Sequence, residues 1–181
     1  MSSDPFYARL AELLPDVDIV VLPPETPEEP SAPPSSAAAS TAAEDGAEGA
    51  LAALRQWWPV LLTELAEPRA IRRAWMPGAD GSHVRATADA RTSLPHEQEC
   101  QSLLSESCGR AVAAGAALIL ERPSAGLLRL YADGVTIEVF APPDVAWCSV
   151  TASVADIDVG ALTVALVTTP PTETPWKQRA G

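Results

Sequence analysis

The sequence has no asparagine, a single lysine (Lys177) and only three cysteines. Arginine supplies nearly all the positive charge, and alanine, proline and glycine are abundant. This bias fits a high-GC bacterial genome and reflects codon usage more than function. An odd number of cysteines without a Cys-x-x-Cys pair argues against a disulfide framework.

Long apolar runs are also missing from the sequence. No run of about 18 apolar residues occurs, so we expect no transmembrane helix. No basic start precedes an apolar core and a small-residue cleavage site, so we expect no signal peptide. These absences, together with the cysteine count, favour a reduced, cytoplasmic protein without membrane insertion.

The negative charge is concentrated at the N-terminus. The chain carries a net charge of −12. Residues 1–50 contain ten carboxylates and one arginine, a net charge of −9, whereas residues 51–181 carry only −3. An acidic leader repels phosphate backbones, so we expect no nucleic-acid partner.

The main structural prediction concerns residues 95–169, which are expected to form one amphipathic helix and a series of short strands. Apolar residues recur three and four positions apart between 100 and 115, a period typical of a helix packed on one side. Ser93 is the expected N-cap of this helix and Gly115 its end. The apolar stripe comprises Cys100, Leu103, Leu104, Cys108, Ala111 and Val112.

The strands are expected at 117–122, 126–132, 135–141, 145–154 and 161–169. Asp133-Gly134 predicts a two-residue hairpin turn, because both residues tolerate a positive φ. Consecutive strands with short connections usually pair antiparallel. The fold class predicted is therefore α+β, an antiparallel β-meander packed against one or two amphipathic helices.

The chain as a whole is predicted to divide into four parts. Residues 1–22 predict a short helix–strand element, and residues 23–49 predict a disordered acidic linker rich in proline, alanine and glutamate. Residues 50–169 form the α+β domain, which begins with a helix at 50–67, kinked by Pro59, and a hairpin of 70–76 with 83–90. Residues 170–181 predict a flexible tail, in which Trp176 either docks back on the body, anchors a partner or stays disordered.

The candidate chemical groups favour structural roles over catalysis. His96 and Cys100 lie four apart and could join Cys108 and His83 at a metal, but the spacing of a zinc site is missing and both cysteines fall on the apolar stripe. Cys148 has no local signature of an activated nucleophile. We therefore expect no metal, no cofactor and no enzymatic activity.

Two groups of side chains suggest a binding surface. Three arginines form the densest basic patch, which could grip an acidic partner, hold the acidic leader, or simply line a solvated strand edge. If no helix covers the face opposite the small residues of 145–154, an aromatic patch would project there. With two apolar residues of the N-terminal helix, the candidate protein-binding residues are Phe140, Val145, Trp147, Phe6, Leu10, Arg69, Arg72 and Arg73.

These features favour a non-enzymatic protein-binding module, an acidic adaptor or chaperone-like protein whose partner is another protein. A helix with an antiparallel meander is an architecture shared by secretion chaperones and toxin-immunity proteins, an analogy at the level of fold. The first alternative is therefore a toxin-immunity-type inhibitor, whose acidity would complement a basic toxin. The second is a small enzyme or ligand-binding domain with a pocket between sheet and helix, and a homodimer remains a further alternative.

Overall fold

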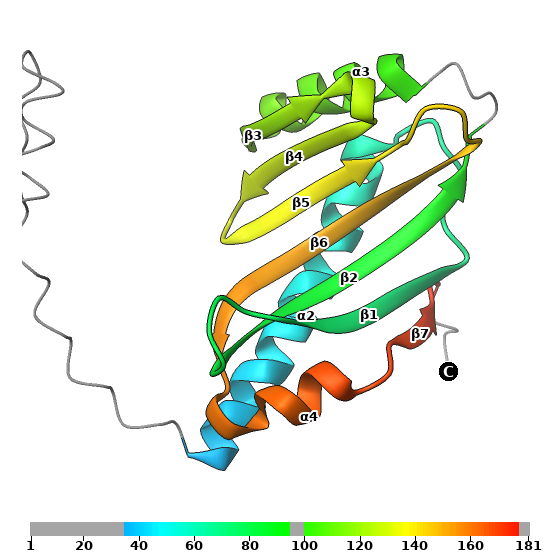
Figure 1. Ribbon diagram of the computed structural model, residues 1–181. Coiled ribbons are helices and arrows are strands. Elements are labelled where there is room, and N and C mark those ends of the chain that lie inside the picture. The colour runs from blue at the N-terminus through cyan, green and yellow to red at the C-terminus, as the bar shows by residue number, and fades with distance from the viewer. Residues whose placement is uncertain (1–34, 95–99, 178–181) are drawn as a thin grey trace, which may run out of the picture. The chain divides into compact units, whose positions relative to one another are not determined.

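The computed structural model describes residues 35–94 and 100–177 (Figure 1). These residues belong to the unit Pro33–Gly181, one of two into which the chain divides. The predicted helix–strand element at 1–22, with Phe6 and Leu10, lies outside the described residues, as does the first part of the predicted linker.

Seven strands form one antiparallel sheet, which confirms the α+β class (Figure 1). The order across the sheet is β3-β4-β5-β6-β2-β1-β7, so the predicted meander of β3 to β6 is followed by the hairpin β1–β2 and a C-terminal edge strand. The strands are β1 (Ala70–Pro77), β2 (His83–Ser93), β3 (Ala117–Arg122), β4 (Leu127–Ala132), β5 (Val135–Phe140), β6 (Trp147–Asp158) and β7 (Thr172–Pro175).

Helix α2 (Ser36–Leu61) lies across one face of this sheet and buries the core. Its first half contacts the sheet through small residues, and a Cβ at Gly46 would overlap the Ile157 side chain. Its second half contributes Leu54, Trp57 and Trp58, all buried. None of the helices in the described part of the chain is long and apolar enough to cross a membrane.

Helix α2 begins well before the expected boundary at residue 50. Ser35 caps it, its hydroxyl accepting a hydrogen bond from the Ala38 amide at 3.3 Å. Residues 36–49, predicted as linker, are therefore helical. The prediction treated alanine and glycine as too small to bury useful surface, yet alanine has the highest helix propensity and small side chains permit close helix–sheet packing.

The C-terminus of α2 is held by α3 (Cys100–Ala113), which corresponds to the amphipathic helix predicted from the apolar stripe between residues 100 and 115. The Ser107 hydroxyl donates to the Leu61 carbonyl at 2.7 Å, and Arg110 donates to the carbonyls of Val60 and Leu61 at 3.0 and 2.8 Å. A cation here satisfies carbonyls without a helical partner and complements the helix dipole. These contacts end α2 at Leu61, earlier than predicted, and Pro59 lies in its last turn without splitting it.

One predicted helix cap and one predicted strand are wrong. Ser93 belongs to β2 and is not the N-cap of α3. Residues 161–169, predicted as the last strand of the meander, instead belong to a 3₁₀ turn (Gly160–Leu162) and helix α4 (Thr163–Thr168). Leu162 and Leu166, four apart, pack against the apolar cluster beneath α2. This tertiary contact overrides the local strand preference.

The C-terminal segment docks on the body. Strand β7 pairs with β1, and the Trp176 amide donates to the Arg69 carbonyl at 3.1 Å. The ring of Trp176 lies 5.4 Å from that of Trp58, and Lys177 forms an ion pair with Glu67 at 3.0 Å. Part of the predicted flexible tail is therefore an edge strand, and Trp176 docks back.

Candidate functional site

The sheet face opposite α2, here called the open face, carries polar and aromatic side chains. Along β2, buried residues alternate with half-buried or exposed ones, as expected for a strand with one face in the core. Directly opposed residues on antiparallel strands share a face. The strand register therefore arranges the open-face side chains in rows that cross the sheet.

One row is charged and runs through six strands. Its members are Glu173 (β7), Arg72 (β1), Asp89 (β2), Thr151 (β6), Glu138 (β5) and Arg129 (β4). Charges that are directly paired across two strands of this row have opposite signs, and uncharged Thr151 separates the carboxylates of Asp89 and Glu138. Arg129 donates to one oxygen of Glu138 through Nε at 3.0 Å and through a terminal nitrogen at 2.6 Å. Burial raises the pKa of Asp89, an effect opposed by the charges of Arg72 and Arg91.

A second row consists mainly of hydroxyl-bearing residues, Thr87, Ser153, Thr136 and Tyr131. A third row runs on the other side of the charged row through Arg91, Ser149, Phe140 and Leu127. Trp147 follows at the end of β6, opposite Ser93. The aromatic and cationic groups thus gather at one end of the open face.

Trp147 is in contact with both an aromatic ring and a cation. The rings of Trp147 and Phe140 lie 5.9 Å apart in an edge-to-face arrangement. The guanidinium of Arg91 lies 4.9 Å from the centre of the Trp147 ring, within the range of a cation–π interaction. These contacts hold the indole in a defined position at the surface.

A cavity of about 830 Å³ lies beside this aromatic cluster and is open to solvent. Its walls come from β1, β2, β6, β7 and the segment that joins α2 to β1. The lining includes three carboxylates and three guanidinium groups as well as Trp147, so the charges of its walls balance. The charged lining residues are Glu67, Asp89, Glu173, Arg69, Arg72 and Arg91.

The structure brings four of the eight candidate binding residues together. Phe140 and Trp147 contact each other, and Arg69 and Arg72 line the cavity that Trp147 also lines. Val145 is half-buried in the connection between β5 and β6. Arg73 is on the opposite face of β1 from Arg72 and forms an ion pair with Glu48 of α2 at 3.4 Å.

Sequence reasoning missed Arg91, Asp89 and Glu173. The second hairpin strand was predicted to end at Ala90, although the alternation of polar residues continues to Ser93 and would have included Arg91. Glu173 carries no local signal, because only the pairing of β7 with β1 places it opposite Arg72.

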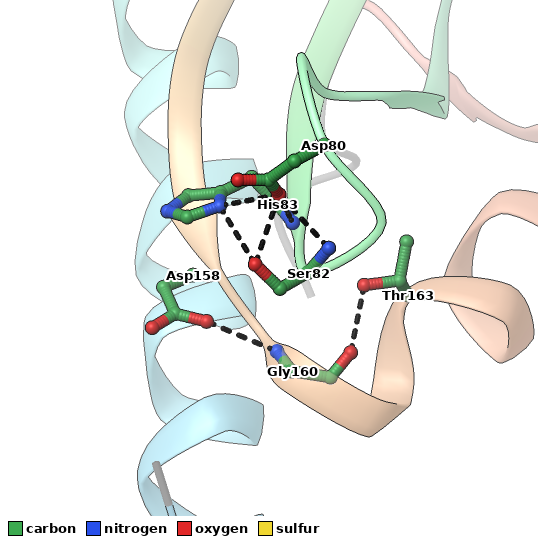
Figure 2. Close-up of polar contacts among 6 residues, drawn as sticks. All are labelled: Asp80, Ser82, His83, Asp158, Gly160 and Thr163. Carbon is green, nitrogen blue, oxygen red and sulfur yellow. Dashed lines mark hydrogen bonds and ion pairs between the residues drawn. The ribbon is translucent and has the colours of Figure 1, made fainter. Parts of the chain in front are cut away.

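A second polar cluster occupies the β1–β2 hairpin tip (Figure 2). One oxygen of Asp80 accepts hydrogen bonds from the Ser82 amide and hydroxyl, both at 2.9 Å, and from the His83 amide at 3.1 Å. Nδ1 of His83 lies 2.8 Å from the same oxygen. The hydrogen bond from His83 is the main cause that holds the pKa of Asp80 well below its usual range, and it also raises the pKa of His83.

This cluster contains serine, histidine and aspartate but lacks the arrangement of a catalytic triad. In a triad the serine and the acid contact different ring nitrogens of the histidine. Here Ser82 Oγ lies 3.0 Å from Nδ1 of His83, the nitrogen that also contacts Asp80 (Figure 2). The three residues therefore form a turn in which the acid organises its neighbours.

The contact between Asp80 and His83 leads to a testable prediction for the pKa of His83. Asp80→Asn is expected to lower the pKa of His83 towards its ordinary value of 6.5, because the charged acceptor that stabilises the protonated ring is replaced by a neutral one. In the folded chain, the contribution of His83 to stability is present below pH 6.5 and disappears as the pH rises through its raised pKa. The contribution of Asp80 to stability is fully present above the ordinary pKa of an aspartate. It disappears as the pH falls through the lowered pKa of Asp80.

Titration of the His83 ring by NMR tests this response. Asp133→Asn, in the exposed β4–β5 turn, is the matched control and should leave the His83 pKa unchanged. An unchanged pKa in Asp80→Asn would show that Asp80 does not control the imidazole.

The other candidate reactive groups are not assembled into a site. Across residues 35–94 and 100–177, no three metal-ligating side chains cluster, and His96 lies outside these residues. Cys148 is fully buried opposite Thr92, whereas His83 is at the other end of β2, about 30 Å away by strand rise. Burial raises the pKa of Cys108. The chain matches no protein-family model, no curated protein and no solved structure.

Proposed function

We propose that this protein is a non-enzymatic, cytoplasmic protein-binding module, an adaptor or chaperone-like protein that holds a partner on its open face. The observation that supports this most strongly is the contact of Trp147 with Phe140 and Arg91 beside the 830 Å³ cavity. Tryptophan and arginine are the residues most enriched in interface hot spots, particularly beside pockets. A preordered indole also loses little side-chain entropy on binding.

The charges around Trp147 suggest how the partner is selected. Carboxylates and guanidinium groups are equal in number in the cavity wall. A surface with balanced charge discriminates through the positions of complementary groups, since its net attraction for any charged protein is small. This balance favours an adaptor over the immunity-type inhibitor, which would depend on net acidity.

The proposal predicts that Trp147→Ala abolishes capture of the partner. Full-length protein serves as bait in co-purification from its native host, followed by mass spectrometry. Loss of a hot-spot indole should weaken binding by about 30-fold, corresponding to about 2 kcal/mol. The matched control is Tyr131→Ala, an exposed aromatic of the same face outside the cavity.

The expected result is one stoichiometric partner held by the unaltered chain and by Tyr131→Ala but lost by Trp147→Ala, with all three proteins melting cooperatively. Binding that persists in Trp147→Ala, or the absence of any partner, would refute the proposal. Capture that disappears at high salt would instead favour the immunity-type inhibitor, since exposed charge attraction is screened.

A further inference from the structure

Strand β7 is a short edge strand that pairs with β1. It has four residues, its register matches Ala70 to Pro175 and Arg73 to Thr172, and Pro170 and Pro171 precede it. Proline lacks an amide hydrogen, so Pro175 cannot donate to the ladder. Few main-chain hydrogen bonds can therefore hold this strand.

Several buried polar atoms without a hydrogen-bond partner belong to β7 or to residues that contact the C-terminal segment. Within residues 35–94 and 100–177, three buried side-chain nitrogen or oxygen atoms have no hydrogen-bond partner: Trp58 Nε1, Arg73 Nε and Thr174 Oγ1. Arg73 is paired with Thr172 of β7, Thr174 belongs to β7, and the Trp58 ring contacts Trp176. Unsatisfied buried polar groups are rare and costly, so their concentration here marks a poorly satisfied contact.

The two groups that belong to the body are both donors. Trp58 Nε1–H and Arg73 Nε–H can only be satisfied by an acceptor. The β1 edge also carries Arg69, Arg72 and Arg73, whereas β7 supplies one carboxylate, Glu173, opposite Arg72. Uncharged Thr172 stands opposite Arg73, which forms its ion pair with Glu48 of α2 through a terminal nitrogen and leaves Nε without a partner.

We propose that the β1 edge is a docking site for an extended acidic segment of another protein, which displaces β7 and pairs with β1 in its place. Addition of a strand to a sheet edge provides affinity through main-chain hydrogen bonds and specificity through alternate side chains. An acidic strand places carboxylates against both Arg72 and Arg73 and brings acceptors to the unpartnered donors. This edge adjoins the cavity beside Trp147, because Arg69, Arg72 and Glu173 also line that cavity. Docking at this edge rests on the pairing of β1 with β7 and does not depend on the function of the open face.

The acidic segment has to compete with β7, which is covalently attached to the same chain as β1. A covalently attached strand competes at a high effective concentration, so the anchors that follow it set the threshold for exchange. The main anchor is Trp176 on Trp58, supported by the ion pair of Lys177 with Glu67. Weakening this anchor should open the edge without altering β1.

The test uses the full-length chain and a dye-labelled peptide with the sequence of residues 170–177 and Thr172→Glu. Fluorescence anisotropy measures its binding to the unaltered protein and to Trp176→Ala. We expect Trp176→Ala to bind about tenfold more tightly, because the resident strand has lost its anchor while the peptide keeps its own tryptophan. Both peptides are amidated at the C-terminus. A control peptide with native Thr172 and with Glu173→Gln then carries no carboxylate and should bind at least about tenfold more weakly.

An engineered disulfide between β7 and β1 tests whether the peptide binds at the β1 edge. Ala70→Cys with Pro175→Cys joins two directly opposed residues of β1 and β7 and retains every arginine. The oxidised protein should not bind the acidic peptide, and reduction should restore binding. Equal binding in both forms would place the peptide elsewhere and overturn the proposal.

Hydrogen exchange of the unaltered chain provides a measurement that does not depend on any variant. The amides of Thr172, Glu173, Thr174 and Trp176 should exchange at least about tenfold faster than those of β2, since local opening is cheapest where contacts are fewest. Equal protection of β7 and β2 would overturn the proposal. So would a folded Trp176→Ala that binds no acidic peptide, or that only forms dimers by exchanging β7.

Discussion

Gly126→Ala is expected to lower the free energy of unfolding by about 3 kcal/mol or more. Gly126 has a φ of 68°, in the left-handed region that disfavours residues with a Cβ. A Cβ there would overlap the Ala141 carbonyl oxygen and lie 2.7 Å from Cα of Pro142. These are backbone atoms and cannot rotate away, and the Gly126 carbonyl already accepts the Ala141 amide at 2.7 Å.

Gly134→Ala is the matched control for this substitution. Gly134 also has a positive φ, 81°, but no atom lies within 4 Å of the position that a Cβ would take there. Its replacement should cost only the conformational penalty, about 1–2 kcal/mol. Urea denaturation followed by circular dichroism measures both. Equal losses would show that the close approach of the chain at Gly126 contributes nothing beyond φ.

Leu54→Ala is expected to destabilise the protein by about 3–4 kcal/mol. Leu54 is fully buried at the centre of the cluster between α2 and the sheet. Alanine has the higher helix propensity, so α2 itself is not weakened by the change. The loss would therefore report the cavity left between helix and sheet.

Val164→Ala provides the corresponding surface control. Val164 is 72% exposed on α4, so truncating it should change stability by no more than about 0.5 kcal/mol. Thermal and urea unfolding of both variants test the comparison. A loss in Leu54→Ala no larger than that in Val164→Ala would mean that α2 is not packed on the sheet in solution.

The meander was predictable because its signals are local. The turn at Asp133-Gly134 has φ values of 50° and 81°, as its sequence required, and β3 spans the predicted residues 117–122. The alternation of β6 also predicted that Trp147 lies on the face opposite its small residues, and the structure places α2 on the small-residue face. Turn preference and strand period both depend on residues close in the chain.

The missed elements are those in which distant contacts override local preference. Residues 36–49 looked too small to bury surface, yet their size allows α2 to approach Ile157. Residues 163–168 looked like a strand, yet Leu166 packs as part of a helix. Thr172–Pro175 looked like a loose tail, yet it completes the sheet beside β1.

The α+β class and the meander with its tight turn follow from the amino-acid sequence alone, whereas which face of the sheet stays uncovered does not. The pairing of distant segments decides that Arg91 contacts Trp147, that Arg73 forms an ion pair with Glu48 of α2, and that Glu173 lies opposite Arg72. The physical reason is the separation of the partners along the chain. Turns and periodicity arise from neighbouring residues, whereas a site built across β1, β2, β6 and β7 exists only once strands far apart in sequence have paired.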